Sequence, residues 1–326
     1  MTKNNDAIII SERQTAIMSE LTLVTSYFDI GRNHWKGFAN GNEKYISNFA
    51  HWARMKNKLI VYTSPEIAPK VMEIRRAYGL ADKTIVIPIQ DITILAPQLY
   101  KATKKAMQNK QSWTFHRKLN NPESWNYRYN YIMELKSYWI QDAIHRGFAD
   151  GMIAWIDFGY DHGGDYFYSE DFDFCWKYNF DPLIHVFLEN PLDDTPIFRI
   201  VQNMKVYIRG NLLVAPAPLW LIFWEEIQHA VFSLAECGLA DDDQTLMVMV
   251  YRRRPELFCP HTTSDWGEGL YAYGGETLRV RPPKKKKSPW IHAMGHTIKY
   301  QLRQKYEKWD IHRRKGTDIE KKYFSK

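Results

Sequence analysis

The sequence contains few cysteines and no cysteine pair. Its 326 residues include three, Cys175, Cys237 and Cys259, which stand far apart without a CxxC spacing. Such a set predicts neither a disulfide framework nor a thiolate metal site. We therefore expect a protein of a reducing compartment, the cytoplasm.

Long apolar runs are also missing. No run reaches the roughly 18 residues that a membrane-spanning helix requires, and the longest, from Leu212 to Trp224, is interrupted by Pro216 and Pro218. Near the N-terminus only Ala7 to Ile10 form an apolar block, and no small-residue cleavage site follows them. We therefore expect neither a membrane span nor a signal peptide.

Several common catalytic motifs are absent from the sequence. It has no GxxxxGK[ST], no GxGxxG after a strand, no HExxH and no GxSxG. These absences argue against a P-loop enzyme, a dinucleotide-dependent dehydrogenase, a zinc protease and an α/β-hydrolase.

The body of the chain lacks an excess of positive charge. The formal net charge is +7, but residues 282–326 contain 14 Lys and Arg against four Asp and Glu, whereas residues 1–281 contain 30 basic and 33 acidic residues. This split favours a basic segment that meets an anionic surface. Because the body is mildly acidic and has no RNA- or DNA-binding motif, we expect no nucleic-acid partner.

What the sequence does contain is an alternation of short β-branched runs with helical segments. The runs predict strands at residues 21–27, 58–63, 84–88, 151–157, 184–188, 205–208, 212–215 and 257–259. Helices are expected at residues 40–54, 64–76, 126–146, 219–237 and 241–251. This order predicts an α/β domain with a doubly wound, mostly parallel sheet flanked by helices. We expect it to span residues 21–281, between a loose arm of residues 1–20 and a tail of residues 282–326.

The tail combines positive charge with an apolar stripe. Four lysines occupy residues 284–287, and Ile291, Met294, Ile298 and Leu302 recur at helical spacing. A basic amphipathic helix of this kind is typical of a segment that lies on an anionic membrane surface. The alternative is a C-terminal helix that packs on the body while its charges face water.

The most informative motif is AWIDFGYDHGGDY, in which Asp157 ends a predicted buried strand. Ligands of open α/β sheets bind at the carboxyl ends of the strands, and a carboxylate there suits Mg²⁺ or Mn²⁺ bound to a diphosphate. Asp161 and Asp165 follow in the same loop. The alternative is that Asp157 only forms a turn, since Asp-x-Gly sequences favour turns.

Three adjacent acids, Asp241, Asp242 and Asp243, begin a predicted helix. N-capping and the helix dipole favour acids at this position. Because adjacent carboxylates repel one another, a catalytic base or a sugar-hydroxyl acceptor is the other interpretation. The sequence leaves both open.

Histidines provide weaker candidates for a metal ligand. His261 follows a short predicted strand, and a neutral imidazole there is able to complete a metal shell, although a loop histidine is commonly just solvated. His292 and His296 stand four residues apart in the basic tail without a glutamate between them, and we expect no metal site there.

These segments together resemble the HtrL/YibB family, which is linked to bacterial surface-polysaccharide and lipopolysaccharide-core gene regions. The resemblance runs from Leu21 to His261 and rests on TLVTSYFDIGR with Trp35 behind it, LIVYTSPE, WIDFGYDHGG, NLLVAPAPLW and DDDQTLM. More distantly, the order of elements is similar to that of GT-A glycosyltransferases. The resemblance therefore implies a GT-A-like fold and a cytoplasmic enzyme that is peripheral at the inner membrane. This enzyme would transfer a sugar from a nucleotide-sugar donor to a glycan or lipid-linked acceptor, and a UDP-sugar is the favoured donor.

Carried over by position, the resemblance also implies roles for particular residues. The donor nucleotide would be bound by Thr25, Tyr27, Arg32, Lys136 and Asp157. A Mn²⁺ or Mg²⁺ ion would be bound by Asp157, Asp161 and His261. Asp243, or Asp242 beside it, would act on the acceptor hydroxyl, and Trp220, Trp224 or Trp266 would stack on a sugar.

One departure from the GT-A pattern bears on the metal. The metal-binding DxD motif of that fold is replaced here by Asp157-Phe158-Gly159. Either Asp161 substitutes for the second acid, or Asp157 and His261 suffice, or side-chain cations take the place of the metal. A non-catalytic protein that binds a sugar nucleotide or a glycan is therefore the alternative function.

Overall fold

The computed structural model describes residues 19–35, 41–109, 112, 115–118, 121–282, 305 and 309. Almost all of the predicted arm, residues 1–20, and of the predicted tail, residues 282–326, lies outside these residues. In the described part, no helix has the length and apolar character needed to cross a membrane.

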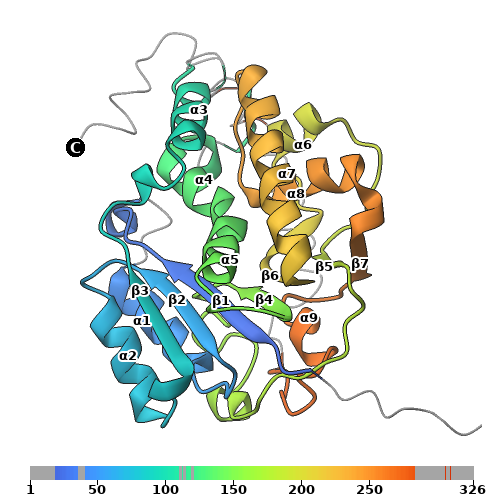
Figure 1. The fold of residues 1–326 in the computed structure, drawn as a ribbon. Coiled ribbons are helices and arrows are strands. Elements are labelled where there is room, and N and C mark those ends of the chain that lie inside the picture. The colour runs from blue at the N-terminus through green and yellow to red at the C-terminus, as the bar shows by residue number, and fades with distance from the viewer. Residues whose placement is uncertain are drawn as a thin grey trace, which may run out of the picture.

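A seven-stranded mixed sheet forms the centre of the described chain (Figure 1). Its strands occur in the order β3-β2-β1-β4-β6-β5-β7, and β6 runs antiparallel to both of its neighbours while the other strands are parallel to one another. The strands are β1 (Thr22–Tyr27), β2 (Leu59–Thr63), β3 (Thr84–Pro88), β4 (Met152–Ile156), β5 (Ile184–Leu188), β6 (Ile208–Pro216) and β7 (Phe258–Thr262). The predicted α/β architecture with a mostly parallel sheet is confirmed.

Helices cover both faces of this sheet. Figure 1 shows one layer above the sheet, which consists of α3 (Pro97–Met107), α4 (Tyr127–Glu134), α5 (Lys136–His145), α7 (Ala217–Glu236) and α8 (Asp243–Arg253), with α6 (Ile197–Asn203) behind it. Below the sheet lie α1 (Asn42–Trp52), α2 (Ala68–Ala77) and the short α9 (Glu268–Tyr271). Side chains of the strands alternate between the two layers. Trp155 packs into the upper core, for example, and Ala154 into the lower one.

Two predicted elements differ from the structure. The predicted helix 126–146 is two helices, α4 and α5, because Leu135 between them has a ψ angle of 0° that interrupts the regular α-helix. Of the two short strands predicted at 205–208 and 212–215, only Ile208 of the first is in a strand; a single strand, β6, begins there and continues through Arg209, Gly210 and Asn211 to Pro216.

The strand order reverses at the centre of the sheet, between β1 and β4, and we call the carboxyl edge of these two strands the crevice. From β1 the chain proceeds outward through β2 and β3 and then returns to place β4 on the other side of β1. Connections that leave in opposite directions from two neighbouring parallel strands open a crevice at their carboxyl ends, and this is where open α/β sheets bind ligands. Tyr27 ends β1 and Asp157 follows β4, so both lie at this crevice.

Candidate functional site

The buried ammonium group of Lys136 joins two carboxylates at the edge of the crevice. Lys136 begins α5, and its Nζ atom lies 2.9 Å from Asp243 Oδ2 and 3.2 Å from Asp157 Oδ1. It also donates a hydrogen bond of 2.7 Å to the Gly210 carbonyl oxygen. Four elements, α5, α8, β6 and the end of β4, therefore meet at one charged group.

Asp157 is the exposed member of this group. Its side chain is 32% exposed, whereas the side chains of Lys136 and Asp243 are 5% and 8% exposed. The indole N–H of Trp155 donates to Asp157 Oδ1 at 2.8 Å, and the Asp157 backbone N–H donates to the Asn211 carbonyl. These bonds orient the Asp157 carboxylate at the mouth of the crevice, where a ligand is able to reach it.

The charges in this group stabilise one another. Burial alone would lower the pKa of Lys136, but the nearby carboxylates of Asp157 and Asp243 raise it well above its ordinary value. Burial raises the pKa of Asp243, and Lys136 acts in the opposite direction. Since an unpaired charge is strongly unfavourable in the interior, Lys136 stays charged only while these partners remain in place.

Gly210 leaves the space that this ion pair requires. A Cβ atom at this position would lie 2.2 Å from Asp243 Oδ2 and 3.0 Å from Lys136 Nζ. Contacts under 3.0 Å do not occur in proteins without movement of one partner. The polar Arg209-Gly210-Asn211 segment inside β6 is therefore part of the site, and the sequence signal for it is a polar triplet within an otherwise apolar strand.

The three adjacent acids have three different surroundings. Asp242 is the N-cap of α8 and accepts a hydrogen bond from the Gln244 backbone N–H, whereas Asp241 accepts from the Thr245 hydroxyl. Asp243 pairs with Lys136. Burial raises the pKa of Asp241 to about 7 and that of Asp242 well above its ordinary value. The capping interpretation is thus confirmed for Asp242, whereas a catalytic or acceptor-binding role of Asp243, which belongs to the charged group, stays a prediction.

Arg32 is a second positively charged residue near the end of β1. Its guanidinium packs against the rings of Trp35, Tyr45 and Tyr129 and donates to the Tyr45 hydroxyl. Among the described residues it makes no ion pair, and its Nε atom is buried without a hydrogen-bond partner. A positively charged group in an aromatic setting at the end of β1 is suited to an anionic ligand.

The other residues predicted to contact the donor are less accessible. Tyr27 stacks between Tyr45 and Phe158, and its hydroxyl donates to Asn42. Thr25 is fully buried inside β1, with no hydrogen-bond partner for its Oγ1 atom. Both side chains are therefore buried, Tyr27 at 8% and Thr25 at 0% exposure.

The structure does not bring the predicted metal ligands Asp157, Asp161 and His261 together. Asp161 is fully buried, 2.6 Å from His51 Nδ1, and accepts hydrogen bonds from the backbone of Tyr166 and Phe167. His261 lies in β7 and packs on Phe187 in the lower core. Across the described residues, the group of three or more potential ligands that the structure shows is His185, Cys259 and His261.

The tryptophans proposed to stack on a sugar also differ in position. Trp220 and Trp224 are buried in the upper core, so they do not face an acceptor. Trp266 is partly exposed, and its carbonyl oxygen accepts a hydrogen bond from Asn211, the residue that also binds the Asp157 backbone. Trp266 is thus the tryptophan of the three that is connected to the crevice.

Sequence comparison places the chain in a family. Residues 19–272 match the family model "Bacterial protein of unknown function (HtrL_YibB)". Protein HtrL of Escherichia coli (strain K12) is 32% identical over 256 residues, which cover 74% of this chain and 87% of that protein. The chain therefore belongs to the HtrL/YibB family.

A comparison of structures finds a more distant similarity. The crystal structure of mouse xyloside xylosyltransferase 1 in its apo form is 16% identical in sequence, with a TM-score of 0.41. The aligned region covers 81% of this chain and 95% of that one.

Proposed function

We propose that this member of the HtrL/YibB family is a glycosyltransferase that transfers a sugar from a nucleotide-sugar donor to a bacterial surface glycan of the lipopolysaccharide or capsule type. The observation that carries the proposal is the Lys136-bridged pair of Asp157 and Asp243 at the carboxyl edge of the sheet, in the crevice between β1 and β4. A ligand-binding edge with one exposed and oriented carboxylate fits chemistry on a polar substrate.

Arg32 supports an anionic donor such as a UDP-sugar. A diphosphate carries negative charge that a planar guanidinium is able to bind in a bidentate manner. Arg32 is positioned by the rings of Trp35, Tyr45 and Tyr129, over which its guanidinium lies. In this proposal the diphosphate lies between Arg32 and the end of β4.

The described residues do not fit a preformed site for Mn²⁺ or Mg²⁺. These ions bind carboxylate and water oxygens, but Asp157 is the only one of the three predicted ligands at the crevice, and the Lys136 ammonium is 3.2 Å from its Oδ1 atom. We therefore derive no catalytic step through a metal. In this proposal Lys136 and Arg32 supply the positive charge on the protein side of the crevice.

Lys136 also determines which carboxylate is free to act. It neutralises part of the charge of Asp243, which is buried, and orients the more exposed Asp157. An inverting transfer requires a carboxylate that removes the proton of the acceptor hydroxyl as it attacks the donor sugar. Asp157 is reachable from solvent, whereas Asp243 is buried beside it, 2.9 Å from the Lys136 ammonium.

The second candidate function is a non-catalytic protein that binds a sugar nucleotide or a glycan. The observation that favours it is that Lys136 contacts both carboxylates, so that neither is without a charged partner in the described structure. Both candidate functions use the crevice to bind a ligand, but only the glycosyltransferase turns over a substrate.

A thermal-shift experiment with nucleotides tests the binding that both functions share. We expect UDP, or GDP or CMP in its place, to raise the melting temperature of the full chain in a saturable way. Replacing Arg32 with alanine should remove the shift, and each nucleotide measured with and without Mn²⁺ shows whether a metal contributes. Stabilisation by oligonucleotides alone would instead indicate a nucleic-acid-binding protein.

A further inference from the structure

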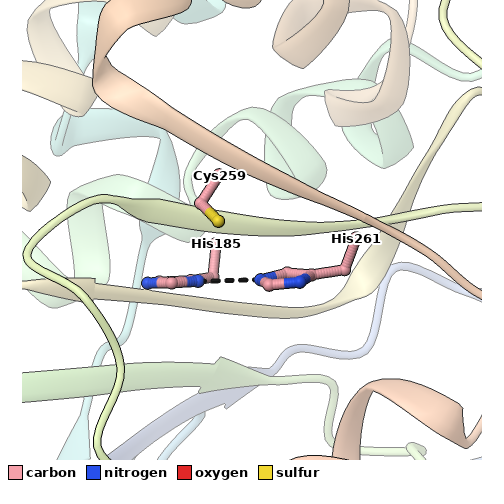
Figure 2. Close-up of side chains that lie close together, drawn as sticks. All are labelled: His185, Cys259 and His261. Carbon is pink, nitrogen blue, oxygen red and sulfur yellow. Dashed lines mark hydrogen bonds between the residues drawn. The ribbon is translucent and has the colours of Figure 1, made fainter.

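A second polar cluster lies where β5 pairs with the edge strand β7. In this parallel pair His185 stands beside Cys259, and Phe187 stands beside His261. Residues two apart on a strand share a face, so all four side chains project toward the lower core and away from Lys136. Figure 2 shows the His185 and His261 rings edge to edge, with the Cys259 sulfur beside them.

We propose that His185, Cys259 and His261 bind a divalent transition-metal ion of the Zn²⁺ class. One ligand atom of each residue lies within 4.8 Å of the other two, and the facing imidazole nitrogens, His185 Nδ1 and His261 Nε2, are 2.8 Å apart. With Zn–N near 2.0–2.1 Å and Zn–S near 2.3 Å, the ligand atoms of a tetrahedral site lie about 3.3–3.6 Å apart. On metal binding, the two facing ring nitrogens would therefore move apart by about 0.5 Å, and the Cys259 sulfur would move about 1 Å closer to them.

The outer hydrogen bonds of the two rings match those of metal-bound histidines. His185 Nε2 donates to the Asp181 carbonyl oxygen at 2.9 Å, and His261 Nδ1 lies 2.9 Å from the Tyr273 hydroxyl. Histidine ligands commonly hold their second nitrogen in this way, which fixes both the ring orientation and the tautomer. The nitrogens left to face each other are the two that would bind the ion.

Metal binding at this cluster has a simple proton balance. The hydrogen bond between the two rings places one proton between their ligand nitrogens, and this proton moves to His261 Nδ1, which then donates to the Tyr273 oxygen. The Cys259 thiol releases its proton to solvent and binds as a thiolate. One proton therefore leaves the protein for each ion bound.

The ligand types determine which ions fit. Imidazole and thiolate select Zn²⁺, Cu or Co²⁺ and not Mg²⁺ or Ca²⁺, which require oxygen ligands. A water molecule or the carboxylate of Asp181, whose negative charge acts on all three residues, completes the coordination. Such a site would fasten the edge strand β7 to β5 and, through Tyr273, to the segment that follows α9. It is independent of the proposed glycosyl transfer.

Titration of the metal-stripped full chain tests this site. We expect one Zn²⁺ per chain and a higher melting temperature with Zn²⁺ but not with Mg²⁺. Co²⁺ should produce the visible absorption bands of a tetrahedral site together with a thiolate charge-transfer band.

Three variants assign the binding to these residues. Cys259→Ser should lose the thiolate band and weaken Zn²⁺ binding by more than about 100-fold, whereas Cys237→Ser, at an exposed cysteine, should match the wild type. Tyr273→Phe keeps all three ligands and should weaken binding about 10-fold, and it decides the question if Cys259→Ser does not fold. The proposal is overturned if the thiolate band is absent in the wild type, or if Zn²⁺ affinity is unchanged in both Cys259→Ser and Tyr273→Phe.

Discussion

Lys136 is a residue whose charge depends on its neighbours. Its ammonium contacts the carboxylates of Asp243 and Asp157 and the carbonyl oxygen of Gly210, and it is almost completely removed from water. A buried ion pair is weak evidence for stability, but the removal of one partner leaves an uncompensated buried charge. This arrangement therefore fixes the position of Asp157 more than it stabilises the fold.

The two neighbouring acids Asp242 and Asp243 are expected to respond differently to the loss of charge. Asp243→Asn breaks the ion pair with Lys136 and should reduce turnover about 100-fold while nucleotide affinity stays unchanged. Asp242→Asn keeps the helix cap, because Asn is as good an N-cap as Asp, and removes a buried like charge. It should retain turnover within a few-fold and should not lower the free energy of unfolding.

Steady-state kinetics, nucleotide titration and urea unfolding of the two variants check this prediction. If Asp242→Asn loses as much turnover as Asp243→Asn, then Asp242 acts in the reaction as well as in the cap. If Asp243→Asn keeps the wild-type rate, the acceptor-side role of Asp243 is wrong.

At the residue scale the sequence predicts the members of the site better than their contacts. Asp157 is identifiable because it ends a buried strand, and Asp243 because it stands in a run of acids. Their connection through Lys136 is not predictable from local patterns, since Lys136 and Asp243 are 107 residues apart in sequence. The same limit explains Asp161, whose burial against His51 depends on a helix more than 100 residues before it.

At the scale of elements, apolar and β-branched runs predict the strands because burial on both faces leaves a continuous signal. The polar triplet Arg209-Gly210-Asn211 hides the start of β6, because the Arg209 guanidinium and the Asn211 side-chain N–H groups find their partners in tertiary contacts that the local sequence does not reveal. The helices α3 and α6 were not predicted. The buried positions of α3, which are Leu99, Thr103, Ala106 and Met107, recur at helical spacing but include a polar and a small residue, and α6 is only 7 residues long. Packing on neighbouring helices determines these elements.

The contact between α3 and α4 contains a titrating carboxyl group. Glu134 is buried and accepts a hydrogen bond from Thr103, and burial raises its pKa to about 8. Between its ordinary pKa of 4.5 and about 8, the folded state holds a proton that the unfolded state loses. The free energy of unfolding contributed by this group therefore falls as pH rises through that window and is constant above it.

Glu134→Gln, which keeps the hydrogen-bond acceptor but does not titrate, isolates this effect. From pH 5 to pH 9 the variant should gain more than about 1 kcal/mol of stability relative to the wild type, since one pKa unit corresponds to about 1.4 kcal/mol. Urea unfolding of both proteins at pH 5, 7 and 9 measures the difference. A difference that is the same at all three values would mean that Glu134 is not a titrating group in this range.

At the scale of the whole molecule, the two faces of the sheet carry different chemistry. The upper face holds the ion pair of Lys136 at the crevice, and the lower face holds the cluster of His185, Cys259 and His261. His261 is separated from Asp157 because β6 and β5 lie between β4 and β7 in the sheet, and also because the alternation of strand side chains directs the two residues to opposite faces. A set of metal ligands that is predicted from sequence positions alone does not take this arrangement of the strands into account.

The excess positive charge of the molecule lies in residues 282–326, and this predicts a membrane partner. Each Lys or Arg close to an anionic surface contributes about 1 kcal/mol, so full-length protein should sediment with anionic but not neutral vesicles, and less so at high salt. A chain ending near Pro282 should stay in solution and still bind nucleotide. If the shortened chain is insoluble or unfolded, the tail belongs to the body and the prediction fails.

The most direct measurement of the central claim is sugar-nucleotide turnover by the wild type and by Asp157→Asn. We predict that one donor in a panel of UDP-, GDP- and CMP-sugars is consumed by the wild type, and that Asp157→Asn, still folded, is slower by at least about 100-fold. Asp150→Asn, an exposed residue at the opposite end of β4, is the matched control and should keep the wild-type rate. A folded Asp157→Asn protein with near-wild-type turnover, or a wild type that binds nucleotide but consumes no donor with glycan acceptors present, would contradict the account.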